Sequence, residues 1–124
     1  GAWSSLVLRA AAIYGPGRGL LAEEQPRFTH ARSLDAVVSR IHADDLAALA
    51  VAGLAGDVQG AWPAADEEPA SGRELLAAWS EKVWAPPRDR QDPPGSRRVD
   101  GSAIARALGV SLRYRTFREA LGAR

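Results

Sequence analysis

Short apolar runs separated by glycine and proline turns predict a chain of alternating strands and helices. The first run, Leu6-Val7-Leu8, lies within residues 5–12 and is followed by the turn Gly15-Pro16-Gly17. An unbroken apolar run of this kind is typical of a strand that is covered on both faces. We therefore interpret residues 5–12 as an interior strand of a parallel sheet.

The following segments predict a loop, a second strand and a helix. Residues 18–34 are irregular and largely polar, whereas residues 35–42 favour an extended strand because they are rich in β-branched side chains. Apolar residues then recur at helical spacing, and Gly56 can end this helix. We expect Asp44 or Asp45 to supply the N-cap oxygen.

The middle of the chain predicts an edge strand and another helix. Residues 60–64 suit a short edge strand because Pro63 cannot donate to a ladder. The acidic turn Asp66-Glu67-Glu68-Pro69 follows. Ser71 and Glu74 then have the spacing of a capping box, which predicts the start of a helix that continues to about residue 84.

The last third of the chain predicts a surface loop and two short helices. Pro86-Pro87 and Pro93-Pro94 bracket a polar segment that suits neither a helix nor a central strand. Asp100 is expected to cap a helix that Gly109 closes, and a second capping-box spacing predicts a final short helix starting near Thr116.

Composition indicates one soluble unit spanning residues 1–124, with 46% hydrophobic and 25% charged residues. The chain has no cysteine, which excludes a disulfide framework and a thiolate metal site. No apolar run approaches the roughly 20 residues that a membrane span needs. The first residues also lack the pattern of a secretory signal, so we expect a cytoplasmic protein with no membrane partner.

Charge is uneven along the chain. Residues 1–82 carry seven basic and eleven acidic side chains, whereas residues 83–124 carry nine basic and four acidic ones. A solvated helix face explains such an arginine-rich end more simply than phosphate contacts do. No row of aromatic residues suited to stacking on bases accompanies these arginines, so we do not expect a nucleic-acid partner.

Four motifs follow one another along the chain. They are Arg9 followed by Tyr14-Gly15-Pro16-Gly17, then Ile41-His42-Ala43-Asp44-Asp45-Leu46, then Asp66-Glu67-Glu68-Pro69, and finally residues 108–119. In this order they resemble the C-terminal part of the extended short-chain dehydrogenase/reductase family, which includes NAD(P)-dependent epimerases and dehydratases. The last two also resemble a bacterial subgroup described as nucleoside-diphosphate-sugar epimerases.

The resemblance implies an α/β fold, namely the C-terminal portion of a Rossmann-like fold with one or two sheet strands and a small α+β substrate-side lobe. The family holds NAD or NADP with a glycine-rich turn after its first strand, where amides face the pyrophosphate. No such segment is present, because Gly15, Gly17 and Gly19 have the wrong spacing and no long helix pattern follows. Dinucleotide binding by this chain alone is therefore not expected.

The family also needs a Tyr whose proton is shuttled and a Lys four residues later that lowers the Tyr pKa. Tyr14 is followed four residues later by Arg18, and it belongs to the turn motif. We therefore expect no catalytic residue in this chain. The resemblance places Ala11, Ala12 and Tyr14 beside the nicotinamide end of the cofactor, although the alanines could equally serve only to pack a strand against a helix.

The resemblance and the residue chemistry suggest a substrate-side set of Tyr14, Arg18, Arg40 and His42. Many nucleotide-sugar members carry an Arg at the position of Val38, and Arg40, two residues further along a strand, would lie on the same face. His42 could carry a proton, yet a structural hydrogen bond toward Asp44 or Asp45 is the simpler interpretation. A single His defines no metal site.

The leading hypothesis is the substrate-side portion of an NAD(P)-dependent epimerase, dehydratase or reductase that is inactive alone because its N-terminal half is missing. Its partner would be a small-molecule substrate. The alternative is a non-catalytic interaction or regulatory module that pairs with a protein partner through an exposed sheet edge.

Overall fold

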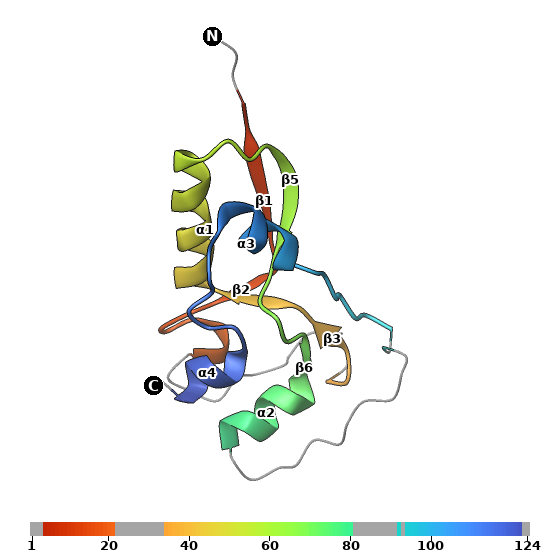
Figure 1. Ribbon diagram of the computed structural model, residues 1–124. Coiled ribbons are helices and arrows are strands. Elements are labelled where there is room, and N and C mark those ends of the chain that lie inside the picture. The colour runs from red at the N-terminus through yellow and green to blue at the C-terminus, as the bar shows by residue number, and fades with distance from the viewer. Residues whose placement is uncertain (1–3, 22–33, 81–91, 93, 123–124) are drawn as a thin grey trace.

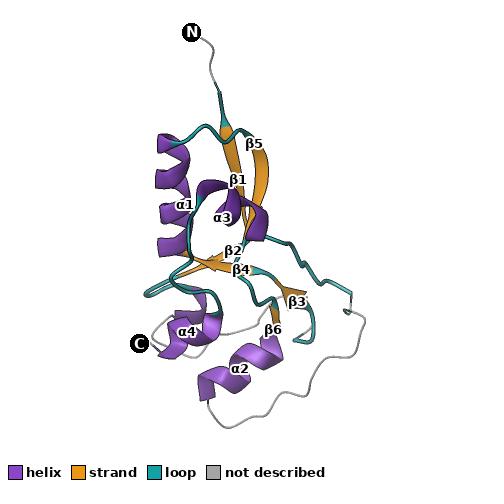
Figure 2. Ribbon diagram, in the orientation of Figure 1, coloured by secondary structure: helices purple, strands orange, loops and turns teal. Residues whose placement is uncertain are grey.

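The computed structural model describes residues 4–21, 34–80, 92 and 94–122 (Figure 1). Two parts follow one another down the long axis of the molecule. One part combines a pair of strands with helices α1 and α3, and the other is a lobe of short strands with helices α2 and α4 (Figures 1 and 2). Among the described residues, none of the helices has both the length and the apolar composition that crossing a bilayer requires.

Strands β1 (Leu6–Ala10) and β5 (Gly60–Ala64) form a parallel pair, in a register that runs from Leu6 opposite Gly60 to Ala10 opposite Ala64. The parallel pairing that the sequence predicted is therefore confirmed, and the protein is a mixed α/β structure. The expected interior position of β1 is not found among the described residues, because β1 has β5 as its one neighbour there and Val7 is 51% exposed.

Helices α1 (Ala43–Ala55) and α3 (Ser102–Leu108) pack against this strand pair. Their shared core contains Ile41, Leu49, Ala64 and Ile104, with Leu6 and Leu8 of β1 packed against it. Gly53 brings α1 close to β1, since a Cβ at this position would collide with Leu6. This core accounts for Leu46 and Leu49 of the apolar pattern in residues 43–55, whereas Leu54 is 89% exposed.

The lobe is built on two further strand pairs. Strand β2 (Ala12–Tyr14) runs parallel to β4 (Arg40–His42), and β3 (Val37–Val38) is antiparallel to β6 (Ala70–Ser71). A single strand was expected over residues 35–42, but it divides at Ser39, whose hydroxyl accepts from Val99 N–H. A second core of Tyr14, Ala70, Leu75, Phe117, Ala120 and Leu121 joins α2 (Gly72–Ser80) and α4 (Phe117–Gly122) to the 3-10 turn Gly19–Leu21.

The chain just after the proline-bracketed segment joins the lobe through backbone hydrogen bonds. Arg97 N–H donates to Val37 O at 2.6 Å and Ser39 N–H donates to Arg97 O at 2.9 Å, so residues around Arg97 extend the β3 pairing. Sequence periodicity gives no sign of this contact because it joins segments about 60 residues apart. Residues 81–91 and 93, and with them the predicted end of the α2 helix and most of that loop, lie outside the described residues.

Helix caps agree with the sequence only in part. The Ser71–Glu74 capping box is confirmed, because Ser71 N–H donates to Glu74 Oε2 at 2.7 Å and Glu74 N–H donates to Ser71 Oγ at 3.1 Å. The predicted N-cap of α1 was wrong: His42 is the N-cap, and its Nδ1 accepts from Asp44 N–H at 3.0 Å. Gly56 ends α1 as expected.

The caps of the last two helices, α3 and α4, also agree with the sequence prediction only in part. Asp100 lies one position before the N-cap of α3, which is Gly101, and its Oδ1 accepts from Ser102 N–H at 2.9 Å. Gly109 closes α3 in the left-handed conformation, with φ of 67°. A side chain at position 101 would overlap the Ala65 backbone, so the cap residue has no room for one. At α4, Glu119 accepts from Arg115 N–H instead of from Thr116, so the second capping box was wrong.

Candidate functional site

The carboxyl ends of β1 and β5 meet the lobe at a set of backbone hydrogen bonds. Ala11 N–H donates to Ala64 O at 2.9 Å, Ala12 N–H donates to Ser39 O at 3.3 Å, and Asp66 N–H donates to Arg40 O at 2.7 Å. Ligands of open α/β sheets bind beyond the carboxyl ends of the strands. The side chains that gather at this junction are therefore the first place to look for a site.

Two buried polar atoms at this junction have no hydrogen-bond partner among the described residues, namely Tyr14 Oη and Asp66 Oδ2. Tyr14 is 2% exposed and Asp66 is 4% exposed. The other carboxylate oxygen of Asp66 accepts from Glu68 N–H at 3.0 Å. A buried polar group without a partner costs free energy, so the pair marks a place where the fold is not optimised for stability alone.

Burial governs the protonation of both groups. Burial raises the pKa of Asp66 to about 7, while the Glu68 amide and the nearby Arg40 guanidinium act in the opposite direction. Burial, with smaller effects from Asp66 and Asp45, raises the pKa of Tyr14 above its ordinary range. Tyr14 is therefore a neutral phenol near neutral pH, and Asp66 titrates there.

Arg40 is held by the lobe. Its Nη1 donates to Val38 O at 3.0 Å and to Ala70 O at 2.9 Å, which ties β4 to β3 and β6. Val38 itself is buried, so the strand places an apolar side chain where many nucleotide-sugar relatives were expected to carry an Arg. The half-buried Arg40 fixes backbone carbonyls and leaves a positive field beside Asp66 and Tyr14.

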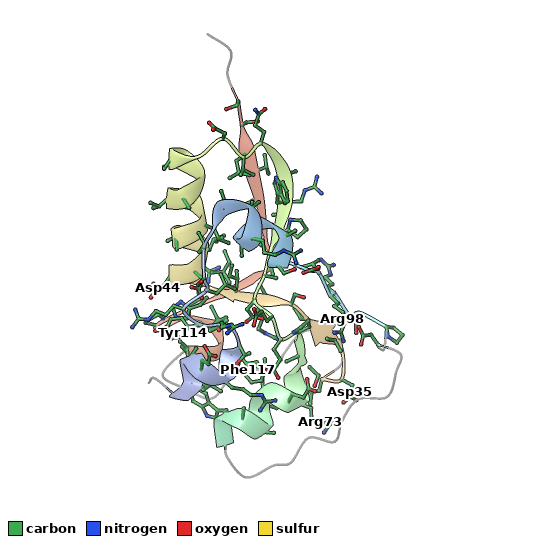
Figure 3. The ribbon with its side chains drawn as sticks, viewed as in Figure 1. Asp35, Asp44, Arg73, Arg98, Tyr114 and Phe117 are labelled. Carbon is green, nitrogen blue, oxygen red and sulfur yellow. The ribbon has the colours of Figure 1, made fainter. Side chains whose placement is uncertain are left out.

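His42 lies in an aromatic group next to this polar pair. Its ring stacks on Tyr114 with centroids 4.2 Å apart and meets Tyr14 edge-on at 5.2 Å. Figure 3 shows Tyr114 and Asp44 close together at the start of α1. Because Nδ1 accepts from Asp44 N–H, the hydrogen bond toward Asp44 that the sequence suggested is present, and it gives His42 a structural role as helix cap.

Asp45 connects the start of α1 to the chain that leads into α4. Its Oδ1 accepts from Arg113 N–H at 2.7 Å and its Oδ2 accepts from Tyr114 N–H at 2.9 Å. The residue is 2% exposed. Asp45 therefore holds the Tyr114 ring against His42, and the two adjacent carboxylates Asp44 and Asp45 do not work as an acid/base pair.

A cavity of about 390 Å³ opens beside the junction. It lies on the side of the molecule where Arg98 is labelled, away from Tyr114 (Figure 3). Arg98 there is paired with Asp92 at 3.0 Å, and Glu67 is paired with Arg115 at 3.1 Å. The residues that line the cavity are Asp66, Glu67, Pro69, Arg98, Val99, Asp100 and Ser102. Asp66 thus belongs both to the buried pair and to the cavity wall.

The structure brings most of the predicted site residues together. The β2–β4 register sets Ala12 opposite Arg40 and Tyr14 opposite His42, and Ala11 directly precedes β2. Arg18 is exposed in the turn after β2, where its N–H donates to Gly15 O at 2.9 Å. No described interaction joins Arg18 to the buried group. Sequence reasoning missed the part played by Asp66, although a polar residue just after a strand is a usable signal.

The glycine turn does not fit a pyrophosphate. Its amides are used inside the turn, since Gly15 N–H donates to Arg18 O at 3.2 Å and Gly17 N–H donates to Leu21 O at 3.2 Å. A phosphate cradle needs such amides free to face the ligand. Among the described residues there is also no group of three or more His, Cys, Asp or Glu side chains that could hold a metal ion.

Two solved structures match this chain over nearly all its length. One is a conserved protein of unknown function from Silicibacter pomeroyi DSS, with 30% identity and a TM-score of 0.70 over 95% of this chain and 47% of that protein. The other is a "putative NAD-dependent epimerase/dehydratase" from Methylobacillus flagellatus, with 30% identity and a TM-score of 0.69 over 98% of this chain and 46% of that protein.

The chain therefore spans about half the length of each of these two proteins. No protein-family model matches the chain, and no curated protein matches it. The similarity in both fold and sequence to the Methylobacillus flagellatus protein supports the resemblance that the four motifs indicated.

Proposed function

We propose that this chain is the C-terminal, substrate-side portion of an NAD(P)-dependent epimerase, dehydratase or reductase with a Rossmann-like fold, related to the nucleoside-diphosphate-sugar subgroup. The observation that carries the proposal is the match to the Methylobacillus flagellatus protein, which takes in 98% of this chain and 46% of that protein. The parallel β1–β5 pair supports it, because parallel strands belong to sheets of several strands covered on both faces.

In this proposal the junction at the carboxyl ends of β1 and β5 faces the reacting part of the substrate. Ala11, Ala12 and Tyr14 form a wall beside the nicotinamide end of the cofactor, where small side chains permit close approach. The raised pKa of Tyr14 keeps its phenol protonated, so it shapes the wall and does not act as a phenolate base. Arg40 and His42 hold this wall in place from β4.

The chemistry must come from elsewhere in the intact protein. The glycine turn uses its amides internally, and the Tyr14–Arg18 pair separates into a buried phenol and an exposed guanidinium. The proposal therefore assigns the dinucleotide cradle and the Tyr/Lys pair to a segment outside this chain. The described residues give the substrate side its shape and its polar groups.

Calorimetric titration with NAD+ and NADP+ tests the proposal. The chain alone should give no binding heat at millimolar dinucleotide, and a longer product of the encoding gene should bind one of the two. Tight binding by the chain alone would contradict the missing cradle. If a longer product does not bind a dinucleotide either, the similarity to epimerases and dehydratases reflects common ancestry and not a shared activity.

A second candidate is a non-catalytic interaction or regulatory module that captures a protein partner. The observation that favours it is that, within the described part of the chain, β1 pairs on one side alone and α1 carries exposed apolar side chains. Light scattering across a range of concentrations tests this alternative, because an uncovered strand edge beside exposed apolar side chains favours self-association. A monomer at all concentrations would count against this alternative.

A further inference from the structure

The cavity of about 390 Å³ beside the junction lies between two walls that are far apart in the sequence. One wall is the acidic turn after β5, and the other is the segment that leads into α3 and contains the labelled Arg98 (Figure 3). Asp66 N–H donates to Arg40 O at 2.7 Å. Val99 N–H donates to Ser39 Oγ at 2.8 Å. Both walls are therefore fixed to the lobe, and the volume is in the range of small-molecule sites, which begins at roughly 300 Å³.

The positive charges at this cavity are already balanced by carboxylates. Arg98 donates to both carboxylate oxygens of Asp92, at 3.0 and 3.1 Å. On the other wall, both carboxylate oxygens of Glu67 accept from Arg115, at 3.1 and 3.4 Å. A phosphate group is bound best by guanidinium groups that turn their paired donors toward it. These two ion pairs therefore give the phosphates of a nucleotide little attraction to the cavity.

Two carboxylates in the walls, those of Asp66 and Asp100, have no ion pair within the part of the chain that the structure describes. Asp66 is 4% exposed, and its Oδ2 has no hydrogen-bond partner there. Hydrogen bonds from Ser102 hold the pKa of Asp100 below its ordinary range, so this residue is ionised at neutral pH. The cavity therefore has a surplus of negative charge.

The cavity also has an apolar lining. Val99 is 39% exposed on one wall, and Pro69 lies on the other. A carbon skeleton that carries a positive charge matches this mixture of apolar side chains and carboxylates. A bare metal ion does not, because it needs several oxygen or nitrogen ligands around one point. The three acidic residues of the lining do not form a group that could hold a metal ion.

We propose that this cavity binds a small organic amine, whose ammonium group is held by the charges of Asp66 and Asp100 and whose carbon skeleton packs against Val99 and Pro69. A buried carboxylate without a partner costs free energy, and a bound cation removes that cost. The inference rests on the proposed function and names its substrate class, because Asp66 belongs both to the cavity wall and to the junction that faces the reacting part of the substrate.

Binding of the amine should be coupled to ionisation of Asp66. Burial raises the pKa of Asp66 to about 7, the charges of Glu68 and Asp45 add to this effect, and the Glu68 amide and the Arg40 guanidinium oppose it. Tyr14 is a neutral phenol and adds no charge. A cation in the cavity favours the ionised carboxyl as Arg40 does, so the affinity should rise by about tenfold from pH 6 to pH 8. An aliphatic amine stays charged over this range.

Three probes of one shape and different charge test the site, namely cyclohexylamine, cyclohexanol and cyclohexanecarboxylate. Each is titrated into the 15N-labelled chain at pH 8 and followed by NMR. Cyclohexylamine should shift the amides of Val99, Asp100 and Ser102 with a dissociation constant in the millimolar range or below, whereas the alcohol and the carboxylate should bind at least about tenfold more weakly. Binding of all three with equal affinity, or no shift with tens of millimolar amine, would overturn the proposal.

Three substitutions that each remove one negative charge show whether the cavity itself holds the amine. Asp66→Asn and Asp100→Asn should each weaken cyclohexylamine binding by about tenfold, and Asp66→Asn should also remove the rise in affinity between pH 6 and pH 8. Asp44→Asn is the matched control, because Asp44 lies at the start of α1 with a side chain that is 59% exposed. An effect of Asp44→Asn as large as that of Asp66→Asn would overturn the proposal.

The outcomes separate this inference from the proposed function. Selective amine binding by the chain, together with a longer gene product that binds no dinucleotide, would support the cation site and refute the enzyme proposal. Dinucleotide binding by the longer product, together with equal binding of the three probes, would support the enzyme proposal and refute the cation site.

Discussion

Replacing Asp66 with asparagine should make the protein more stable at neutral pH and remove a pH dependence. Burial raises the pKa of Asp66 from 3.8 to about 7, so the folded protein favours the neutral acid. A raised carboxyl pKa means that the folded state holds a proton that the unfolded state has released. Stability therefore falls as pH rises between about 4 and 7, and it levels off above that range.

The size of the effect follows from the two pKa values. A difference of about three pKa units corresponds to about 4 kcal/mol at full ionisation, and relaxation of the chain around Asp66 makes this an upper limit. Asparagine matches the neutral acid in shape, and its Oδ1 can still accept from Glu68 N–H. The variant should thus equal the parent protein near pH 4 and exceed it by up to about 4 kcal/mol near pH 8.

Urea unfolding followed by tryptophan fluorescence at several pH values measures this difference directly. The charged and polar groups around Asp66, including Arg40, Asp45, Glu68 and Tyr14, are present in both proteins, so their contributions to the difference largely cancel. Asp100→Asn is a control of opposite sign, because the hydrogen bonds from Ser102 lower the pKa of Asp100 and its ionised form stabilises the fold above acidic pH. The reasoning would be refuted if the difference in unfolding free energy between Asp66→Asn and the parent protein did not change with pH, or if it grew as the pH falls.

Three further substitutions test the packing around the site by the same unfolding assay. Asp45→Ala should cost about 3 kcal/mol, because the part-buried amides of Arg113 and Tyr114 lose their buried acceptor; a loss below 1 kcal/mol would show that water replaces the carboxylate. Gly101→Ala should cost at least about 2 kcal/mol, since the new Cβ overlaps the Ala65 backbone, and a neutral result would contradict that contact. Ser71→Ala should cost about 1 kcal/mol by removing one arm of the capping box with Glu74, whereas no change would show that this cap is not needed.

Local signals in the sequence predicted most of the elements. The apolar periodicity of α1, the Ser71–Glu74 box and the glycine after α3 each depend on neighbours within a few residues, and the structure contains all three. The helix cap at His42 was missed because Asp45, a common capping residue, instead accepts hydrogen bonds from the amides of Arg113 and Tyr114, 68 and 69 residues further along the chain. A residue type that suits two roles cannot reveal from sequence which role it takes.

The candidate site was predictable only in outline. Tyr14, Arg40 and His42 were identified through the resemblance and the residue chemistry, and they lie on the paired strands β2 and β4, with Tyr14 opposite His42. The unpaired Tyr14 Oη and Asp66 Oδ2 depend on how β5 meets the lobe, which no local pattern encodes. The arginine-rich end was interpreted as a solvated face, and ion pairs such as Arg115–Glu67 and Arg118–Glu68 support that interpretation.

Amide hydrogen exchange along β1 tests most directly whether this strand belongs to a larger parallel sheet. In the chain alone, the amides of Val7 and Arg9 should be protected by β5, and those of Leu6 and Leu8 should exchange rapidly. In a longer product of the encoding gene, Leu6 and Leu8 should become as slow as Val7 and Arg9. Slow exchange of Leu6 and Leu8 in the monomeric chain alone, or fast exchange in the longer product, would contradict the account.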